Sequence, residues 1–417
     1  MNDSNFKKRK YDIIVYGATG FTGKLVAKYL LKTYGVNGPV SWAIAGRDEK
    51  KLELIRRNLK LDKNDLDIFI ASSFDIDSLK SMVLKTNVIL STVGPYAIYG
   101  DSLVAVCVEN GTHYCDLAGE VQWIRKIIDL HQEEARKTGS KIVHCCGFDS
   151  VPMDIGVWFL QQEVYQKTGK YCQSISMMVK KLKGSVSGGT IASLINIIKE
   201  SRKNKNIKHI LNNPYSLNPS GERKGLENLK ENNIIFRQEI KSWTAPFIMA
   251  GINTKVVRRS HALSRYPYGH NFSYDESLIT GSGFIGWIKG KLINLFLILL
   301  ISLLAFSTTR TILEKFILKK PGEGPDRELQ KSGFFHLIQV GKLPNGDIFK
   351  SEIIGDQDPG YGSTAKMISE CAVCLSTEKL DKEGGIWTPA SVMAKPLIKR
   401  LRDKAGLIFK MNNVESF

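Results

Sequence analysis

The chain has 417 residues, of which 43% are hydrophobic and 24% charged, the composition of a globular protein large enough for two or three domains. Its 59 Lys and Arg residues outnumber its 41 Asp and Glu residues, and the net charge of +18 favours anionic partners. No nucleic-acid-binding motif accompanies this charge, so we expect no nucleic acid partner and favour phosphates or an acidic membrane surface.

The N-terminal stretch Tyr11–Gly23 reads YDIIVYGATGFTG and has the pattern of a dinucleotide-binding loop. Apolar residues up to Tyr16 predict a short buried strand, and 24–32 has helical periodicity. Between them, the first glycine permits a tight turn, the second lets the backbone approach a pyrophosphate, and the third lets the helix pack on the sheet. The alternative is a purely structural turn. The predicted phosphate-binding residues are Gly17, Thr19, Gly20, Phe21, Thr22 and Gly23.

Further short apolar segments predict strands that alternate with helices after this loop. Strands are predicted at 40–45, 67–71, 88–91, 111–116 and 141–145, with helices at 49–59, 101–110 and 120–137. Alternation at this pitch is typical of a doubly wound parallel sheet. We therefore predict an α/β protein in which 1–165 forms a Rossmann dinucleotide-binding domain.

Residues at the ends of three predicted strands would hold the rest of the cofactor. Arg47 follows the second strand, where an arginine pairs with the 2′-phosphate of NADP and a carboxylate would accept the ribose hydroxyls of NAD. Asp75 lies in the loop after the third strand, where the adenine edge would rest. We expect NADP, with NAD as the alternative; for Arg47 the alternative is a solvated loop residue. The segment after the fourth strand, beside the pyrophosphate and the nicotinamide ribose, is Thr92, Val93, Gly94 and Pro95.

Polar residues near the same strand ends are candidates for proton transfer. Tyr96 is the predicted proton donor, with Asp116 and Asp149 as helpers. Asp149 would either orient the tyrosine or cap the following helix, because Pro152 looks like a first-turn proline. Tyr361, at a glycine-flanked turn, is a second donor candidate or only a helix-entry residue.

Histidine and cysteine residues give no metal signal. His144 lies inside an apolar strand and is expected to be a core residue. Cys371 and Cys374 form a C-x-x-C motif, but their apolar neighbours indicate one buried helix face, so we predict no metal site. The odd count of 7 cysteines and the lack of an apolar signal segment predict free thiols in a reducing, intracellular compartment.

The remainder of the chain has a mixed helix and strand pattern. Strands are predicted at 175–182, 248–258, 335–340 and 347–353. The glycine turn Ser187–Thr190 leads into a helix over 191–199 and is interpreted as structural rather than as a second phosphate site. We predict an α+β substrate domain over 166–355 that covers the C-terminal ends of the Rossmann strands. A helical segment over 356–417 is expected to pack back on the core.

The run Leu292–Phe306 is the most apolar in the chain. Its 15 residues would span about 22 Å as a helix, less than the ~30 Å hydrocarbon core of a bilayer. Lys289 and Lys291 before the run and Arg310 after it suit a helix at a membrane surface. We favour contact of 284–310 with a membrane or lipid droplet, and a buried core helix is the alternative.

Taken together, the motifs resemble the saccharopine dehydrogenase-like oxidoreductases, the group that also contains the bacterial trans-acting enoyl reductases. The resemblance covers nearly the whole chain. It rests on GATGFTG (17–23), AGR (45–47), VGPYAIYG (93–100), HYCDLAGE (113–120), CGFDSVPMD (146–154), SGGT (187–190), APFIMA (245–250), YGHNFSYDE (268–276), DPGYGSTAKM (358–367) and GGIWTPASVM (384–393).

The resemblance implies a Rossmann domain, NAD(P) binding and an association with lipid metabolism or lipid droplets. No arginine set that would hold a dicarboxylate substrate is identifiable, which argues against lysine metabolism. We expect an NADP-dependent reductase of a C=C or C=N bond in a lipid-linked or hydrophobic substrate. The expected location is the cytoplasmic face of a membrane or lipid droplet, with the mitochondrion as the alternative. A homodimer is an open alternative to a monomer. The rival functions are a non-catalytic nucleotide-binding protein on lipid and a saccharopine-type amino-acid dehydrogenase.

Overall fold

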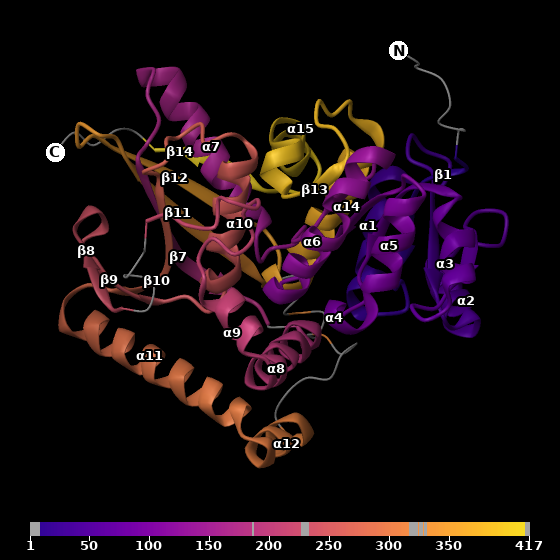
Figure 1. Cartoon of the computed structure of the whole chain (residues 1–417), viewed down its shortest axis with the longest axis horizontal. Coiled ribbons are helices and arrows are strands. Elements are labelled where there is room, and N and C mark those ends of the chain that lie inside the picture. Colours follow the sequence, from indigo (N-terminus) through magenta and orange to yellow (C-terminus); the bar gives the residue numbers. More distant parts are fainter. Residues whose placement is uncertain are drawn as a thin grey trace.

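The computed structural model describes residues 9–185, 187–226, 233–316, 324, 328 and 332–412. Two seven-stranded sheets form its framework, and Figure 1 shows them side by side with helices between and around them. The α/β class and the Rossmann sheet predicted for the N-terminal part are confirmed.

The first sheet is entirely parallel, in the order β13-β6-β5-β4-β1-β2-β3. Its residues alternate between two buried layers, because Ile13 and Val15 face one side and Ile14 and Tyr16 the other. Its strands are β1 (Tyr11–Tyr16), β2 (Trp42–Gly46), β3 (Ile68–Ile70), β4 (Thr86–Ser91), β5 (His113–Asp116), β6 (Lys141–Val143) and β13 (Gly385–Trp387).

Helices cover both faces of this sheet. Leu30 and Leu52 pack in the same layer as Met367, which places a C-terminal helix beside two N-terminal ones, whereas Leu79 and Leu103 lie in the opposite layer. The helices of the first layer are α1 (Phe21–Tyr34), α2 (Glu49–Asn58) and α14 (Thr364–Thr377), and those of the second are α3 (Ile76–Val83), α5 (Asp101–Glu109) and α6 (Val121–Thr138).

The second sheet is mixed, in the order β14-β12-β11-β7-β10-β9-β8. Only the β7–β10 pair is parallel among the described strands of this sheet; the others are antiparallel. The strands are β7 (Ser174–Lys183), β8 (Ile235–Arg237), β9 (Ser242–Pro246), β10 (Ser273–Gly281), β11 (Phe334–Lys342), β12 (Ile348–Gly355) and β14 (Ile408–Met411). The predicted alternation over 347–353 is confirmed, since every second residue of β12 is buried.

Three further groups of helices complete the structure. Helices α7 (Val151–Thr168), α10 (Ala250–Leu263) and α15 (Pro389–Asp403) pack on one another, and α7 and α10 also contact the second sheet. Helices α8 (Gly188–Lys203) and α9 (Lys205–Asn212) contact each other, and α9 contacts α6. The long helix α11 (Gly283–Ala305) runs along the edge of the second sheet and is followed by α12 (Ser307–Phe316) (Figure 1). Short turns are α4 (Tyr96–Tyr99), η1 (Gln238–Ile240) and η2 (Pro359–Ser363).

Several predictions for the C-terminal half are wrong. The predicted strand 248–258 is the helix α10, because this β-branched segment is buried on nearly all sides between α7, β10 and α15, and such packing overrides strand propensity. The segment 356–417 is not purely helical, since β13 extends the Rossmann sheet and β14 extends the second one. The strands β8, β9 and β10 were not predicted.

Candidate active site

The loop after β1 brings bare backbone to the C-terminal edge of the Rossmann sheet. Gly17 has a φ of 89°, and a Cβ atom at this position would lie 2.6 Å from Val93 Cγ2, so only glycine fits against the segment after β4. A Cβ atom on Gly23 would collide with the carbonyl oxygen of Gly17. Both glycines therefore have the steric roles expected of a dinucleotide-binding turn.

The N-terminus of α1 is open to an anion. Its N-cap is Gly20, no side chain caps the first amides, and the first turn holds no acidic residue. The free N–H groups and the helix dipole suit a pyrophosphate, so the described residues fit a dinucleotide cofactor. Phe21 and Thr22 line the adjoining cavity, and Thr19 lies beside Gly46 at the end of β2.

The predicted ribose and adenine residues lie near this loop but differ in availability. Arg47 follows β2, is exposed, and makes no side-chain hydrogen bond or ion pair with the other described residues, so its guanidinium is available for a 2′-phosphate. Asp75 caps α3 by accepting a hydrogen bond from the Ser78 amide at 3.2 Å, which occupies part of its carboxylate. The contacts of both residues with a cofactor stay predictions.

The segment after β4 is tied to the glycine loop. Thr92 Oγ1 donates to the Gly17 carbonyl at 3.2 Å, and Thr92 and Gly94 line the same cavity as Gly20. Pro95 is the N-cap residue of α4. This arrangement brings the ends of β1 and β4 to one wall, as expected for the pyrophosphate and the nicotinamide ribose.

A cavity of about 560 Å³ extends from this wall to the second sheet domain. Its volume is in the range of small-molecule sites. Its far side is formed by α8, α9 and the segment that leads into α10. The apolar residues on that side are Ile191, Leu194, Ile197, Leu211, Phe247, Ile248, Met249 and Ile252.

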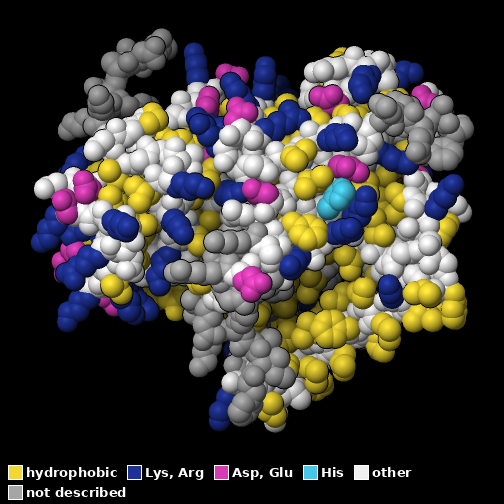
Figure 2. All heavy atoms as spheres, turned by 180° about the vertical axis from the view of Figure 1, so that it is seen from behind, with side chains coloured by type: hydrophobic (Ala, Val, Ile, Leu, Met, Phe, Trp, Pro, Cys, Tyr) yellow, Lys and Arg dark blue, Asp and Glu magenta, His cyan; other side chains and the backbone are white. Residues whose placement is uncertain are grey.

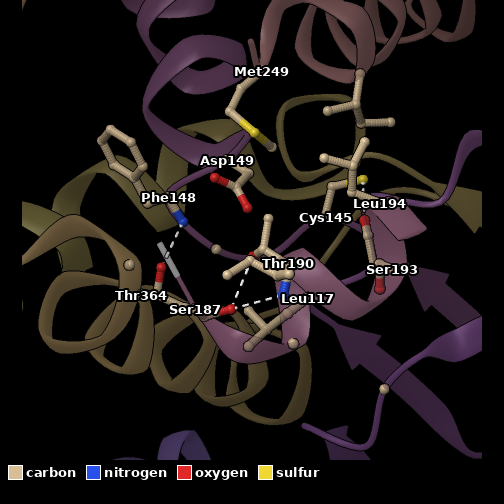
Figure 3. A pocket seen from close by; sticks show the side chains of 18 of the residues that line it. Leu117, Cys145, Phe148, Asp149, Ser187, Thr190, Ser193, Leu194, Met249 and Thr364 are labelled. Atoms are coloured by element: carbon tan, nitrogen blue, oxygen red, sulfur yellow. Dashed lines mark hydrogen bonds between the residues drawn. The ribbon is translucent and has the colours of Figure 1, made fainter. Parts of the chain in front are cut away.

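Asp149 lies in this cavity, in the loop between β6 and α7. Figure 3 shows its carboxyl group among Met249, Thr190 and Cys145, and no hydrogen bond to it is recorded among the described residues. Burial raises the pKa of Asp149 to about 6. The capping alternative is wrong, because the N-cap residue of α7 is Ser150 and no side chain caps that helix.

Tyr96 touches the cavity but its hydroxyl is used by the backbone. It is 5% exposed, donates to the Ser91 carbonyl at 3.2 Å and accepts from the Leu117 amide at 3.1 Å. Burial and the neighbouring Asp116 raise its pKa well above the ordinary range, so the phenolate is strongly disfavoured. This geometry favours a structural role for Tyr96 over the predicted donor role.

Asp116 does not line the cavity. Its Oδ1 accepts from the Ala118 and Cys145 amides at 2.9 and 3.3 Å, and its Oδ2 accepts from His144 Nδ1 at 2.7 Å. The predicted core position of His144 is confirmed, since the ring is 3% exposed. Asp116 therefore joins the ends of β5 and β6 and is not placed to assist a reaction in the cavity.

Glu120 was not singled out from the sequence. It is fully buried, and its carboxylate accepts from the Tyr96 and Ala97 amides at 2.7 and 3.1 Å and from Ser193 Oγ at 2.8 Å. Burial raises its pKa. Because its partners are 24 and 73 residues away in sequence, no local pattern reveals it. Glu120 holds α8, the apolar wall, against the Rossmann domain.

The remaining predicted features are lining or core elements. Tyr361 is 2% exposed, its hydroxyl accepts from the Gly188 amide at 3.2 Å, and its ring meets the Phe21 ring edge-on with centroids 4.7 Å apart. The turn at Ser187 is a helix start, since Ser187 accepts from the Thr190 amide. Cys371 and Cys374 are buried in α14, as expected for one helix face.

Comparison with known proteins agrees with this geometry. Residues 13–143 match the family model of the saccharopine dehydrogenase NADP binding domain. A Mycobacterium tuberculosis protein with the provisional name of a trans-acting enoyl reductase is 34% identical over 406 residues, covering 94% of this chain and 96% of the relative. The trans-acting enoyl reductase of Mycobacterium leprae is 31% identical over 415 residues, covering 96% and 97%.

Among solved structures, saccharopine dehydrogenase (L-Glu forming) from Saccharomyces cerevisiae aligns with a TM-score of 0.53. The alignment covers 97% of this chain and 100% of the yeast chain at 11% identity, so it bears on the fold alone. The parallel sheet joined to a second mixed sheet is therefore shared with that enzyme.

Proposed function

This chain belongs to the saccharopine dehydrogenase-like oxidoreductase family that includes the trans-acting enoyl reductases, and from that premise we propose that it reduces an activated C=C bond of a hydrophobic, lipid-linked substrate with NADPH. Family membership gives an NADP-binding domain and the oxidoreductase class. The single observation that supports the proposed substrate is the cavity, which joins the glycine loop to an apolar wall with one carboxyl group between them.

When bound, NADPH would supply a hydride, with both electrons, for transfer to the β-carbon of the unsaturated carbonyl compound, leaving NADP⁺. The open N-terminus of α1 and the residues after β4 would hold the cofactor. The α-carbon of the substrate requires a proton, and the protonated carboxyl group of Asp149 donates it. The carboxylate then regains a proton from solvent. Leu194 and its apolar neighbours bind the acyl chain and exclude water from the site.

A saccharopine-type activity on amino-acid imines has less support. Such substrates carry carboxylates that need cationic partners. None of the described residues that line the cavity is an Arg, Lys or His. The composition of this cavity favours an uncharged, apolar substrate.

NADPH oxidation measured against enoyl thioesters of increasing acyl length tests the proposal. We expect kcat/KM to rise with chain length, and Leu194→Asn to lower it by about tenfold for the longest thioester but little for the shortest. Leu130→Asn, an exposed leucine on α6, is the matched control. Tight NADPH binding without turnover of any enoyl substrate would instead favour a non-catalytic nucleotide-binding protein.

Cofactor choice is tested at Arg47. We expect Arg47→Gln to weaken NADPH binding by about tenfold and to leave NADH binding unchanged, because only NADPH carries the 2′-phosphate. Fluorescence titration measures both dissociation constants. Equal affinities of the unmodified chain for NADPH and NADH would contradict the role of Arg47.

A further inference from the structure

The helix α11 presents an apolar face that no described residue covers. It has 23 residues and is long and apolar enough to cross a membrane, yet only 11% of its most apolar stretch of 18 residues is buried in the protein. A core helix of the same composition would be mostly buried, so the core alternative for this segment is wrong. Figure 2 shows the corresponding band of hydrophobic side chains along the lower edge of the molecule.

One stripe of α11 contains its buried residues. Gly286, Gly290 and Leu304 are buried against the protein, and they lie on one stripe with the half-buried Leu297. The opposite face is apolar and exposed, which is rare in a soluble monomer. Its residues, each more than half exposed, include Leu292, Leu295, Phe296, Ile298 and Leu299.

Both ends of α11 are attached to the same folded body. Near its start, Gly286 packs closely against Gly281 of β10, and a Cβ atom on Gly290 would lie 3.1 Å from Ile234. At its end, the Arg202 guanidinium of α8 donates to the Ala305 carbonyl and lies 5.8 Å from the Phe306 ring centroid. The helix is therefore held against the protein near both of its ends.

This attachment excludes a span across the bilayer. An upright helix of 23 residues would cover about 34 Å and cross the hydrocarbon core. The edge strand β8, its neighbour β9 and the charged Arg202 would then enter the hydrocarbon, where open sheet edges and cations are strongly disfavoured. An orientation in the plane of the membrane places only the outer face of α11 in lipid.

The charges around α11 are complementary to anionic headgroups. No acidic residue occurs between Glu276 and Glu314, whereas Lys289 and Lys291 are exposed on the helix itself. Cations on this border can contact headgroup phosphates while the apolar face enters the acyl region. Further exposed cations, in α8 and α9, are Arg202, Lys203, Lys205 and Lys208, and of these Arg202 contacts the C-terminal end of α11.

We propose that α11 is an in-plane docking helix that inserts its outer face into one leaflet of an anionic phospholipid bilayer without crossing it. Insertion removes the exposed apolar band from water, and the lysines anchor its border. This surface is distinct from the cavity, so the proposal does not depend on the reaction catalysed there.

Flotation with phosphatidylcholine vesicles that contain a minor share of phosphatidylserine tests the docking. The unmodified chain should float with the vesicles, and the double variant Leu295→Asp/Leu299→Asp should bind at least about tenfold more weakly. Leu130→Asp, with a similarly exposed leucine on α6, should bind like the unmodified chain. Unchanged NADPH titration shows that each variant is folded. Lys289→Glu/Lys291→Glu should weaken binding only to vesicles that contain phosphatidylserine.

Depth measurements test the in-plane orientation. The 7 native cysteines are buried, so single cysteines introduced as Phe284→Cys, Leu292→Cys and Leu299→Cys accept a fluorophore selectively. Lipids that carry a quencher at one depth should quench the fluorescence of all three labels equally. Quenching that changes steadily from the first label to the third would show a spanning helix and overturn the proposal. The proposal is also overturned if the unmodified chain fails to float with the vesicles. In that case, a dimer seen by sedimentation without lipid, and dissociated by Leu295→Asp/Leu299→Asp, would show that a second copy of the chain covers this face.

Discussion

Two carboxyl groups at neighbouring strand ends have opposite surroundings. Asp116 ends β5 and Asp149 follows β6, and these strands pair in parallel through Cys115 and Val143. All the recorded contacts of Asp116 are with amides and with His144 inside the protein, whereas Asp149 faces the cavity without a recorded partner. Position at a strand end is therefore not enough to identify an acid group that acts on substrate. What matters is whether neighbouring donors already occupy the carboxylate.

The largest effect is expected at Asp149. Asp149→Asn removes the proton donor while keeping shape, so kcat should fall by about 100-fold or more. NADPH affinity, measured by fluorescence, should stay within about twofold because the residue lies beyond the phosphate-binding loop. If the variant keeps its activity, the contrast between the two carboxyl groups has no catalytic meaning.

At Asp116 the expected loss is in stability. Both carboxylate oxygens of Asp116 accept hydrogen bonds, whereas an asparagine has one oxygen and an NH₂ group. Asp116→Asn would therefore point an N–H donor at another donor, and the free energy of unfolding should fall by about 2 kcal/mol. Urea denaturation measures this change. The folded variant should turn over within a few-fold of the unmodified chain, and a loss as large as that of Asp149→Asn would assign Asp116 to the reaction.

The pH dependence should follow Asp149. With its pKa raised to about 6, the donor is protonated below that pH, and kcat/KM should fall by about tenfold per pH unit above it. The native state also retains a proton that the unfolded chain releases near pH 4, so this residue lowers stability as pH rises from about 4 to 6. If kcat/KM does not begin to fall near pH 6, Asp149 is not the proton donor.

The smallest effect is expected at Tyr96. Tyr96→Phe loses two hydrogen bonds to backbone groups, and the free energy of unfolding should fall by about 1 kcal/mol. Activity should change by less than about threefold. A larger loss in kcat, with stability unchanged, would restore Tyr96 as the proton donor.

Local patterns predict the cofactor side of this molecule well. The spacing of Gly17, Gly20 and Gly23 between a strand and a helix predicts the glycine loop, although the contact that requires Gly17 is with the distant Val93, and the six N-terminal strands all occur where the sequence predicts them. Asp149 is found as a candidate, but sequence cannot separate it from Asp116 because their surroundings come from folding.

The substrate side depends on contacts between distant segments. Glu120 holds Ser193 across 73 residues, and the three-residue strand β13 joins the sheet through pairing with β6. The β-branched residues of α10 mislead a propensity argument because burial decides their conformation. Contacts of this kind cannot be predicted from the pattern of residues in a short segment of the sequence.

The cofactor domain closes only with the end of the chain. β13 pairs with β6, and α14 covers the face formed by β1, β4 and β5. During synthesis, the first six strands leave the ribosome long before α14 and β13 do. Until then, the sheet face that α14 covers is exposed to water and β6 is an unpaired edge strand. A fragment restricted to 13–143 should consequently aggregate rather than bind nucleotide, so a fragment for expression needs to include α14 and β13.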